Sequence, residues 1–293
     1  MKLGVALGGG GAKGIAHLGA LRVLEAAGAS IAIITGTSAG AIVGALYAAG
    51  KSVDEIERIA RRWTLRQFLT LDRTGMGMFS TDGLRQVIES ELGRDARIEN
   101  LPRRFAAIAV DLDAQTEMVF ESGSVADAVC ASAAFPGFFA PVIIGERRFI
   151  DGGTLNPVPC DVARRMGADG IIAVDLSADE PVFTTAGDRP LNREQIITAI
   201  LSTAEKRKIV RVTARAIGIM GRAIREYRRT RARPDLVIYP NVQNVGLLDF
   251  DLTNECLAAG EAATRAVLPQ IQNLISDSRW QITARKIKQK LRR

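Results

Sequence analysis

The segment from Ala26 to Gly50 constrains the fold most, because its 25 residues carry no charge. A single helix of that length could span a bilayer, so a membrane span is one interpretation. The two halves differ, however. SIAIITG is rich in β-branched residues, whereas AGAIVGALYAAG consists mainly of small residues that suit a helix. Gly36 and Gly40 interrupt the middle, so the segment predicts a buried strand, a sharp turn and a buried helix.

Apolar strand patterns alternate with helical patterns along the chain, which is typical of an α/β fold with a mainly parallel central sheet and helices on both faces. The 293 residues contain neither repeats nor a low-complexity linker. We therefore expect one domain over residues 1–275 and a basic tail over residues 276–293. The expected strands are Lys2–Leu7, Ser30–Thr35, Arg104–Asp111, Gly170–Leu176 and Asp235–Tyr239, with shorter pieces at 118–122 and in a hairpin that turns at Gly145-Glu146. The expected helices are Ile15–Ala27, Ala39–Ala49, Val53–Leu69, Asp82–Leu92, Pro159–Met166, Glu194–Arg231 and Asn254–Ile275, and loops are expected at 75–78 and 179–192.

The cysteines and the histidine argue against a metal site. Cys130, Cys160 and Cys256 are widely separated, no CxxC pair occurs, and the chain has one histidine. Zinc sites of the usual kinds need more ligands than this, so we expect no metal and no other cofactor. Buried free thiols indicate a reducing compartment, and the N-terminal MKLGVALGGGG is too short for a signal sequence. The sequence therefore predicts a cytoplasmic protein.

GTSAG, residues 36–40, has the pattern G-x-S-x-G, which can hold a nucleophile on a sharp turn between a strand and a helix. The same pattern arises by chance in glycine-rich chains, and this chain has 28 glycines. If Ser38 is a nucleophile, Gly36 and Gly40 would form a nucleophile elbow around it. A base must then accept the proton of the Ser38 hydroxyl.

A glycine run follows the first expected strand and matches G-x-G-x-x-G, the pattern of dinucleotide-binding loops. Such a site also needs an acidic residue about 20 positions further on, but no acid occurs between Glu25 and Asp54. We favour an oxyanion hole, in which backbone N–H groups stabilise the negative charge of an acyl-transfer intermediate. Close packing of a helix on the sheet is the structural alternative. The candidate oxyanion-hole residues are Gly9, Gly10, Gly11, Ala12, Lys13 and Gly14.

The best candidate for the base is Asp151, which ends an expected strand and precedes Gly152 and Gly153. Such a turn leaves a carboxylate at the sheet edge, although a turn without a catalytic role is the alternative. Partial burial would raise the carboxyl pKa towards values useful for a base. His17 precedes Ser38, which excludes the Ser, acid, His order of α/β-hydrolases. His17 is more simply interpreted as a structural residue of the first helix.

These motifs, in this order, resemble the patatin-like phospholipase family, and in particular its shorter bacterial members. The resemblance rests on GVALGGGGAKGIAHLGAL, GTSAGAIVGAL, ASAAFPGFFAPV and FIDGGTLNPVP, from Leu3 to about Val174, and more loosely on GLLDF and AGEAA. It implies an α/β fold that hydrolyses acyl esters of lipids through a Ser–Asp dyad without a metal. By the resemblance, Ser38 is the nucleophile, Asp151 is the base and the loop Gly9–Gly14 is the oxyanion hole. Plant members have Ala where this chain has Gly153.

The resemblance makes phospholipid or lysophospholipid the expected substrate class. A catalytically weak regulatory or interaction protein of the same fold is the main alternative, although an intact serine, aspartate and glycine loop argue against it. A dinucleotide-binding protein is the more remote alternative. The small and aromatic residues of the 131–139 stretch suit an acyl pocket, with ordinary core packing as the alternative. The expected pocket residues are Phe135, Pro136, Phe138 and Phe139.

Two basic segments together carry more positive charge than the net +7 of the chain. From Lys206 to Arg233 there are 11 basic residues and one acid, Glu226, and the tail from Arg279 to Arg293 adds seven basic residues and no acid. If helical, the tail places Trp280 on an apolar face, which suits an anionic membrane surface. A solvated helix with a frayed tail is the alternative, and nucleic acid is not expected, because one aromatic offers no stacking platform. We therefore predict a peripheral association with the inner membrane surface, and the sequence does not indicate an oligomeric state.

Overall fold

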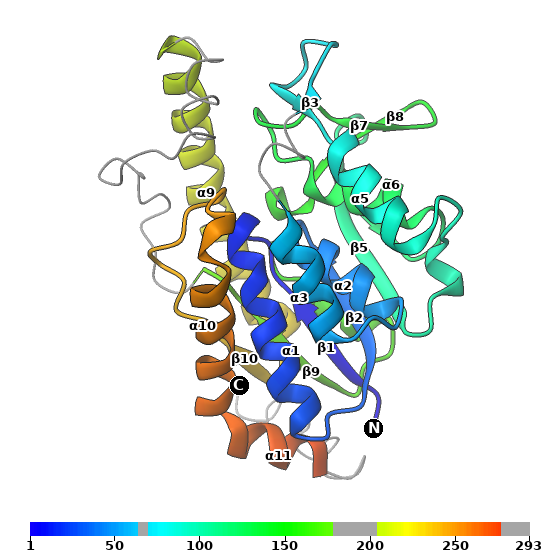
Figure 1. The fold of residues 1–293 in the computed structure, drawn as a ribbon, viewed down its shortest axis with the longest axis vertical. Helices are drawn as coiled ribbons and strands as arrows, with labels where there is room; N and C mark the ends of the chain where they lie inside the picture. The colour runs from blue at the N-terminus through cyan, green and yellow to red at the C-terminus, as the bar shows by residue number, and fades with distance from the viewer. Residues whose placement is uncertain (64–69, 178–203, 277–293) are drawn as a thin grey trace.

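The computed structural model describes residues 1–63, 70–177 and 204–276. Within them an eight-stranded sheet has the order β10-β9-β1-β2-β5-β8-β7, and β6 also pairs with β5 (Figure 1). The strands β10, β9, β1, β2 and β5 run parallel, while β6, β7 and β8 join antiparallel. The expected α/β class with a mainly parallel sheet is therefore confirmed. The strands are β1 (Leu3–Leu7), β2 (Ile31–Thr37), β5 (Arg104–Asp111), β6 (Thr116–Phe120), β7 (Val142–Ile144), β8 (Arg147–Asp151), β9 (Gly170–Val174) and β10 (Leu236–Ile238).

Alternating side chains of the parallel strands enter two separate hydrophobic clusters. In β1, Leu3, Val5 and Leu7 belong to the larger cluster, whereas Ala6 belongs to the smaller one. This is the period of two that a strand covered on both faces requires. The parallel register pairs Leu7 of β1 with Gly36 of β2. The carboxyl ends of these strands therefore lie side by side.

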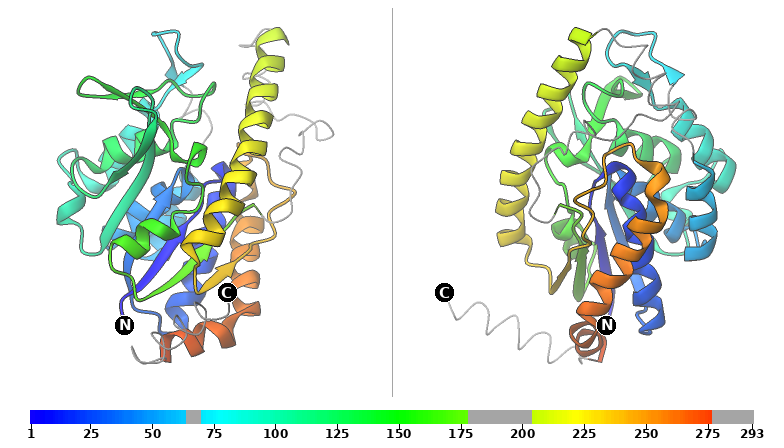
Figure 2. Two further views of the ribbon diagram at one scale, coloured as in Figure 1. Left: turned by 180° about the vertical axis from the view of Figure 1, so that it is seen from behind. Right: turned by 60° about the vertical axis from the view of Figure 1, so that its left-hand side comes forward.

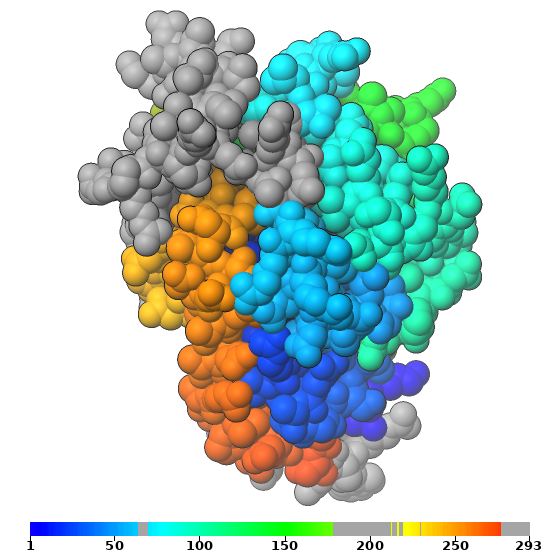
Figure 3. Space-filling model, in the orientation of Figure 1, coloured from blue at the N-terminus to red at the C-terminus, as the bar shows by residue number. Residues whose placement is uncertain are grey.

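The larger cluster lies under a thick helical layer and the smaller cluster under a thin one. Figure 1 shows α1, α2, α3 and α10 over one face of the sheet, and Figure 3 shows the side chains of α1, α3 and α10 closing that face. Figure 2 shows α9 on the outside of the molecule, away from α1 and α3. The thick layer contains α1 (Ala16–Ala26), α2 (Ala39–Ala48), α3 (Val53–Arg62), α5 (Asp82–Leu92), α6 (Val125–Ala133), α10 (Thr253–Ala266) and α11 (Leu268–Ser276). The thin layer contains α7 (Cys160–Arg165) and α9 (Ala204–Ala232).

Most expected elements are present, and the hairpin at Gly145-Glu146 joins β7 to β8. Two helix boundaries were wrong. The expected helix Val53–Leu69 stops as α3 at Arg62, because the backbone of Trp63 is extended. The expected helix Asn254–Ile275 is broken at Val267 into α10 and α11, since Pro269 cannot donate the hydrogen bond that would continue one helix.

The sequence did not predict α6 or the two-stranded sheet of β3 (Thr70–Leu71) and β4 (Phe79–Ser80). The expected loop at 75–78 lies between β3 and β4. The parts of the predictions that cover residues 64–69, 178–203 and 277–293, including the loop at 179–192 and nearly all of the basic tail, lie outside the described residues. Within the described ranges, no helix is both long and apolar enough to cross a bilayer. The uncharged segment 26–50 instead forms the end of α1, the strand β2 and the helix α2.

Candidate active site

Ser38 lies on a sharp turn between β2 and α2. Its backbone φ is 54°, in the left-handed region that side chains rarely adopt. The flanking residues must be glycines because neighbouring backbone lies too close for a side chain. A β-carbon at Gly36 would lie 2.3 Å from the Gly40 carbonyl oxygen, and one at Gly40 would lie 2.2 Å from the Leu7 carbonyl oxygen. The geometry is that of a nucleophile elbow, in which a strained turn exposes a serine at the end of a strand.

Ser132 fixes the backbone of this elbow. The N–H of Ser38 donates to the Ser132 hydroxyl at 2.9 Å, and that hydroxyl donates to the carbonyl of Ile108 at 2.5 Å. Ser132 is fully buried on α6, the helix that the sequence did not predict. A lone serine among small apolar residues was the only available signal for this role. It was not distinguishable there from ordinary packing.

A second buried contact holds Thr37, the residue before Ser38. The Thr37 hydroxyl donates to the carbonyl of Asn156 at 2.8 Å. The Asn156 side chain in turn donates to Glu117 at 3.0 Å and to Asp161 at 2.9 Å. These contacts join the elbow to the segment that follows the Asp151 turn. Because the elbow and this segment are more than a hundred residues apart in the chain, no local motif could indicate the contact.

The glycine loop lies directly against the elbow. A β-carbon at Gly9 would lie 3.3 Å from Cβ of Ser38, and one at Gly14 would lie 2.5 Å from Cβ of Ala39. At least two of the six candidate amides are already hydrogen bonded within the protein. Gly9 N–H donates to Pro157 O at 3.1 Å, and Ala12 N–H donates to Leu247 O at 2.9 Å. Lys13 is buried. At the start of the loop, the amides of Gly10 and Gly11 are the better candidates for oxyanion donors.

Asp151 ends β8 and lies beside Ser38, whose side chain stabilises the charged form of the Asp151 carboxyl group. The same carboxylate accepts the N–H of Gly153 at 2.7 Å, and the Asp151 N–H donates to Ala134 O at 2.9 Å. Gly152 is needed for close approach, because a β-carbon there would lie 2.1 Å from the Ile108 carbonyl oxygen. The structure thus brings together the two residues predicted as nucleophile and base.

Burial changes the acidity of Asp151. The side chain is almost fully enclosed, and desolvation of the charged form raises the pKa of Asp151 to about 6. Hydrogen bonds from Ser38 and Gly153 oppose this shift by stabilising the carboxylate. The Asp151 carboxylate is therefore ionised at neutral pH and more basic than an exposed one. Both properties suit a general base.

His17 has a structural position. Its Nε2 lies 2.8 Å from the Gly8 carbonyl oxygen, which can only accept, so Nε2 carries the hydrogen. The other ring nitrogen, Nδ1, is buried without a hydrogen-bond partner, and burial lowers the pKa of His17 to about 4. His17 is therefore neutral at pH 7. It holds the start of the glycine loop by its bond to Gly8.

The predicted pocket residues are half-buried and pack with one another. The rings of Phe138 and Phe139 are 4.8 Å apart, and Phe138 lies 5.1 Å from the ring of Phe79 on β4. The carbonyl of Phe135 accepts the N–H groups of Phe138 and Phe139 at 3.1 and 2.9 Å. Pro136 is half-buried in the same turn. Their role in an acyl pocket stays a prediction.

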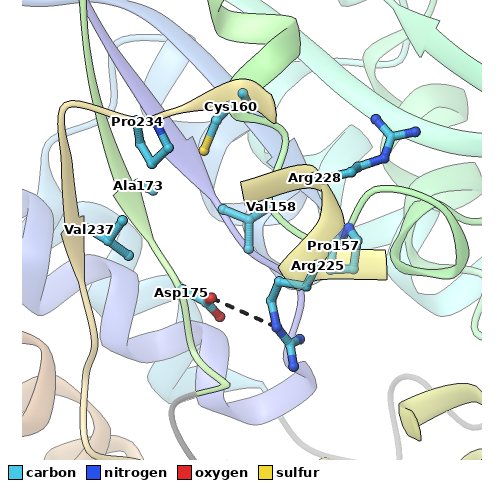
Figure 4. A pocket seen from close by; sticks show the side chains of 10 residues that line it. Pro157, Val158, Cys160, Ala173, Asp175, Arg225, Arg228, Pro234 and Val237 are labelled. Atoms are coloured by element: carbon cyan, nitrogen blue, oxygen red, sulfur yellow. Dashed lines mark ion pairs between the residues drawn. The ribbon is translucent and has the colours of Figure 1, made fainter. Parts of the chain in front are cut away.

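A small cavity of about 20 Å³ lies beneath α9 rather than at Ser38 (Figure 4). Asp175, which follows β9, faces Arg225 across it, and Arg228, Pro157 and Cys160 are among the other lining residues. The volume corresponds to about one water molecule, too little for a substrate. A larger hollow of about 360 Å³ is lined by Lys51, Glu91 and Arg97, and so also lies away from Ser38. Across the described residues, no group of three or more metal-ligating side chains is gathered.

Comparisons with known proteins identify the relatives of this chain. Residues 5–164 match the family described as patatin-like phospholipase. Over 195 residues the chain is 34% identical to patatin-like phospholipase domain-containing protein 6 of Homo sapiens, a match that covers 64% of this chain and 14% of that protein. Over 285 residues it is 30% identical to an uncharacterised NTE family protein of Mycobacterium tuberculosis, covering 93% of this chain and 47% of that one. The chain thus spans less than half the length of either relative.

A solved structure shares the fold. VipD from Legionella pneumophila superposes with a TM-score of 0.52 over 92% of this chain and 66% of that chain. The two sequences are 14% identical. This likeness supports the architecture of the sheet and its helices.

Proposed function

Because the chain belongs to the patatin-like phospholipase family, we propose that it hydrolyses lipid esters, with phospholipid or lysophospholipid as the substrate class. The observation that carries the proposal is the position of Ser38, on its strained turn, beside the buried Asp151 carboxylate. The strained backbone of Ser38 and the adjoining glycine loop support it further. Family membership supports lipid-ester hydrolysis, and the residue roles are our inference from the geometry.

In the proposed first step, Asp151 accepts the hydroxyl proton while Oγ of Ser38 attacks the ester carbonyl carbon. The resulting oxyanion accepts hydrogen bonds from the amides of Gly10 and Gly11. The carbon–oxygen bond to the alcohol then breaks, and the protonated Asp151 returns its proton to the leaving alkoxide. The acyl group remains bound to Ser38 as an ester.

In the second step, Asp151 accepts a proton from water, whose oxygen attacks the acyl-enzyme. The same amides stabilise the second oxyanion, and the fatty acid leaves as Ser38 regains its proton. Preorganised donors of this kind typically contribute about 10²–10³-fold each to the rate. All of the proposed proton transfers pass through one carboxylate.

Fatty-acid release from membrane lipid extracts tests the proposal. The parent protein and its Ser38→Ala form are incubated with the same extract, and the released fatty acids are quantified by mass spectrometry. We expect release by the parent at least about 10³-fold above the variant, the scale for loss of a nucleophile. Equal release by both proteins would contradict the proposal. The lipid classes that the parent depletes would identify the head group.

A further inference from the structure

The helix α9 contacts the rest of the protein through charged side chains. Arg228 pairs with Glu117 of β6 at 2.8 Å and with Asp161 of α7 at 3.1 Å, and Arg225 pairs with Asp175 at 3.8 Å. Gly221, on the same side, lies close to the turn after Asp151, since a β-carbon there would be 3.8 Å from the Gly153 carbonyl oxygen. Three ion pairs and the close approach at Gly221 thus attach this side of α9 to the protein, together with Ala232, which packs against the smaller hydrophobic cluster.

The opposite side of α9 is apolar and exposed. Val212 is 69% exposed, Ile219 60%, Met220 52% and Tyr227 57%. These positions step along the helix by three or four residues with the exposed Ala216 and Ala223, which places them on one face about 180° from Arg225 and Arg228. We call Val212, Ala216, Ile219, Met220, Ala223 and Tyr227 the outer stripe. In the structure this face points away from the core.

A folded domain gains no stability from such an arrangement. Removing apolar surface from water stabilises a fold by about 25 cal/mol per Å². Side chains that stay in water do not provide this stabilisation. A row of them on one exposed face is typical of an interaction surface. The contact side of α9 can be explained by its packing on the protein, whereas the outer stripe cannot.

The charges around the stripe indicate what covers it. Arg222 is exposed beside it, and Arg231 lies on its other border with its guanidinium carbon 5.0 Å from the centre of the Tyr227 ring. Glu226, the one acid from Lys206 to Arg233, lies on the same border as Arg222, so the described charges that flank the stripe are two arginines and one glutamate. Two copies of this helix packed stripe to stripe would bring like charges together. An anionic lipid surface would accept the apolar side chains and pair with the arginines.

We propose that α9 is a membrane-docking helix that inserts the outer stripe into the surface of an anionic bilayer. The choice of lipid as the occupant rests on the proposed lipid-ester hydrolysis, whereas the stripe and its charges are independent of it. Gly221, on the opposite side of the same helix, lies close to the Asp151 turn, so docking would place the bilayer surface one helix diameter, roughly 10 Å, from the proposed site. The predicted tail, Arg279–Arg293, lies outside the described residues and is not needed for this surface.

The test measures binding to vesicles of phosphatidylglycerol and phosphatidylcholine by flotation. The variant Val212→Ser/Ile219→Ser removes two members of the stripe. Its matched control is Ile143→Ser, which removes an equally exposed isoleucine (58%) from β7 at the opposite edge of the sheet. We expect the double variant to bind at least about tenfold more weakly and the control to bind within about twofold of the parent. A loss in the control as large as in the variant would overturn the proposal.

A second pair tests the charges. Arg222→Gln/Arg231→Gln should weaken binding to phosphatidylglycerol vesicles and reduce its salt dependence, whereas Arg62→Gln/Arg94→Gln, in exposed arginines on and after other helices, should change neither. Sedimentation of the same proteins without lipid tests whether a second copy of the chain covers the stripe instead. If the parent is a dimer, and the stripe variant is a monomer with unchanged vesicle binding, the stripe is a contact between two copies. Hydrolysis of a short soluble ester is measured in parallel. If the parent cleaves no ester but the stripe variant still loses vesicle binding, the proposed function fails and the docking surface stands.

Discussion

The helices α1 and α9 cover opposite faces of one sheet and turn opposite kinds of side chain towards it. On α1, Leu18, Leu21 and Leu24 are fully buried in the larger hydrophobic cluster. On α9, arginines face the protein and the apolar stripe faces outwards. The periodicity of a helical sequence identifies an apolar face, but which face meets the core depends on the partners available there. The difference separates a helix used for folding from one that we propose meets a bilayer.

The comparison extends to two buried carboxylates, Asp151 beside Ser38 and Asp175 beneath α9. Both are nearly enclosed at the carboxyl ends of strands. Asp151→Asn should reduce ester hydrolysis by at least about 10³-fold, because the base is lost. Asp175→Asn, which removes a partner of Arg225, should stay within about tenfold of the parent. Initial rates on a short soluble ester measure both, and equal losses would mean that Asp151 has no special role.

The two helices should also differ in what they contribute to stability. Leu21→Ala on α1 removes a fully buried side chain and should lower the free energy of unfolding by about 2–5 kcal/mol. Ile219→Ala on α9 should change it by less than about 0.5 kcal/mol, since its side chain is mostly in water. Denaturant titration of both variants checks this. A similar cost for the two would show that the outer stripe is packed against the protein.

The activity should depend on pH through Asp151. Because burial raises the pKa of Asp151 to about 6, and only the ionised carboxylate can accept a proton, kcat/KM should fall as the pH drops through that value. The slope should approach about tenfold per pH unit on the acid side. A rate profile on a soluble ester measures it, with Asp175→Asn as the control that keeps the same profile. A profile that is flat down to about pH 4 would exclude Asp151 as the base.

The smallest expected effect on activity belongs to His17→Gln. Glutamine can donate the same hydrogen bond to Gly8, so activity should remain within a few-fold of the parent. Stability should show the residue more clearly. Since burial lowers the pKa of His17 to about 4, the unfolded chain takes up its proton first, and this contribution to stability is lost as the pH falls from about 6.5 towards 4. Unfolding titrations should find that His17→Gln loses less stability over that range, and an inactive folded variant would contradict the dyad.

The part of the site that could be predicted from the sequence is the part where glycines let two backbone segments approach closely. Backbone contacts leave no room for a side chain at Gly36, Gly40 and Gly152. The motifs that contain these glycines are therefore short and can be recognised in the sequence. Those motifs predicted that Ser38 and Asp151 lie at strand ends, where the structure has them, and that the two act together stays a prediction. The same logic predicted the strands of the parallel sheet, whose two buried faces require long apolar runs.

The unpredicted part depends on contacts between distant segments. Ser132 holds Ser38 across 94 residues of sequence, and its helix α6 carries no strong periodic signal. The N–H of Gly9 is bonded to Pro157 and that of Ala12 to Leu247, which reduces the number of amides that can stabilise an oxyanion. The glycine pattern alone does not show this. The direction of the α9 stripe belongs to the same class, because it is set by acids on β6 and α7.

Covalent labelling of Ser38 tests the central claim most directly. A fluorophosphonate probe reacts with a serine whose hydroxyl is activated and whose oxyanion is stabilised, because its tetrahedral phosphorus resembles the acyl-transfer intermediate. The account predicts a single adduct on the peptide that contains Thr37-Ser38-Ala39, unaffected by EDTA and strongly slowed in Asp151→Asn. Folded parent protein that stays unlabelled, or that carries the adduct on another residue such as Ser132, would contradict it.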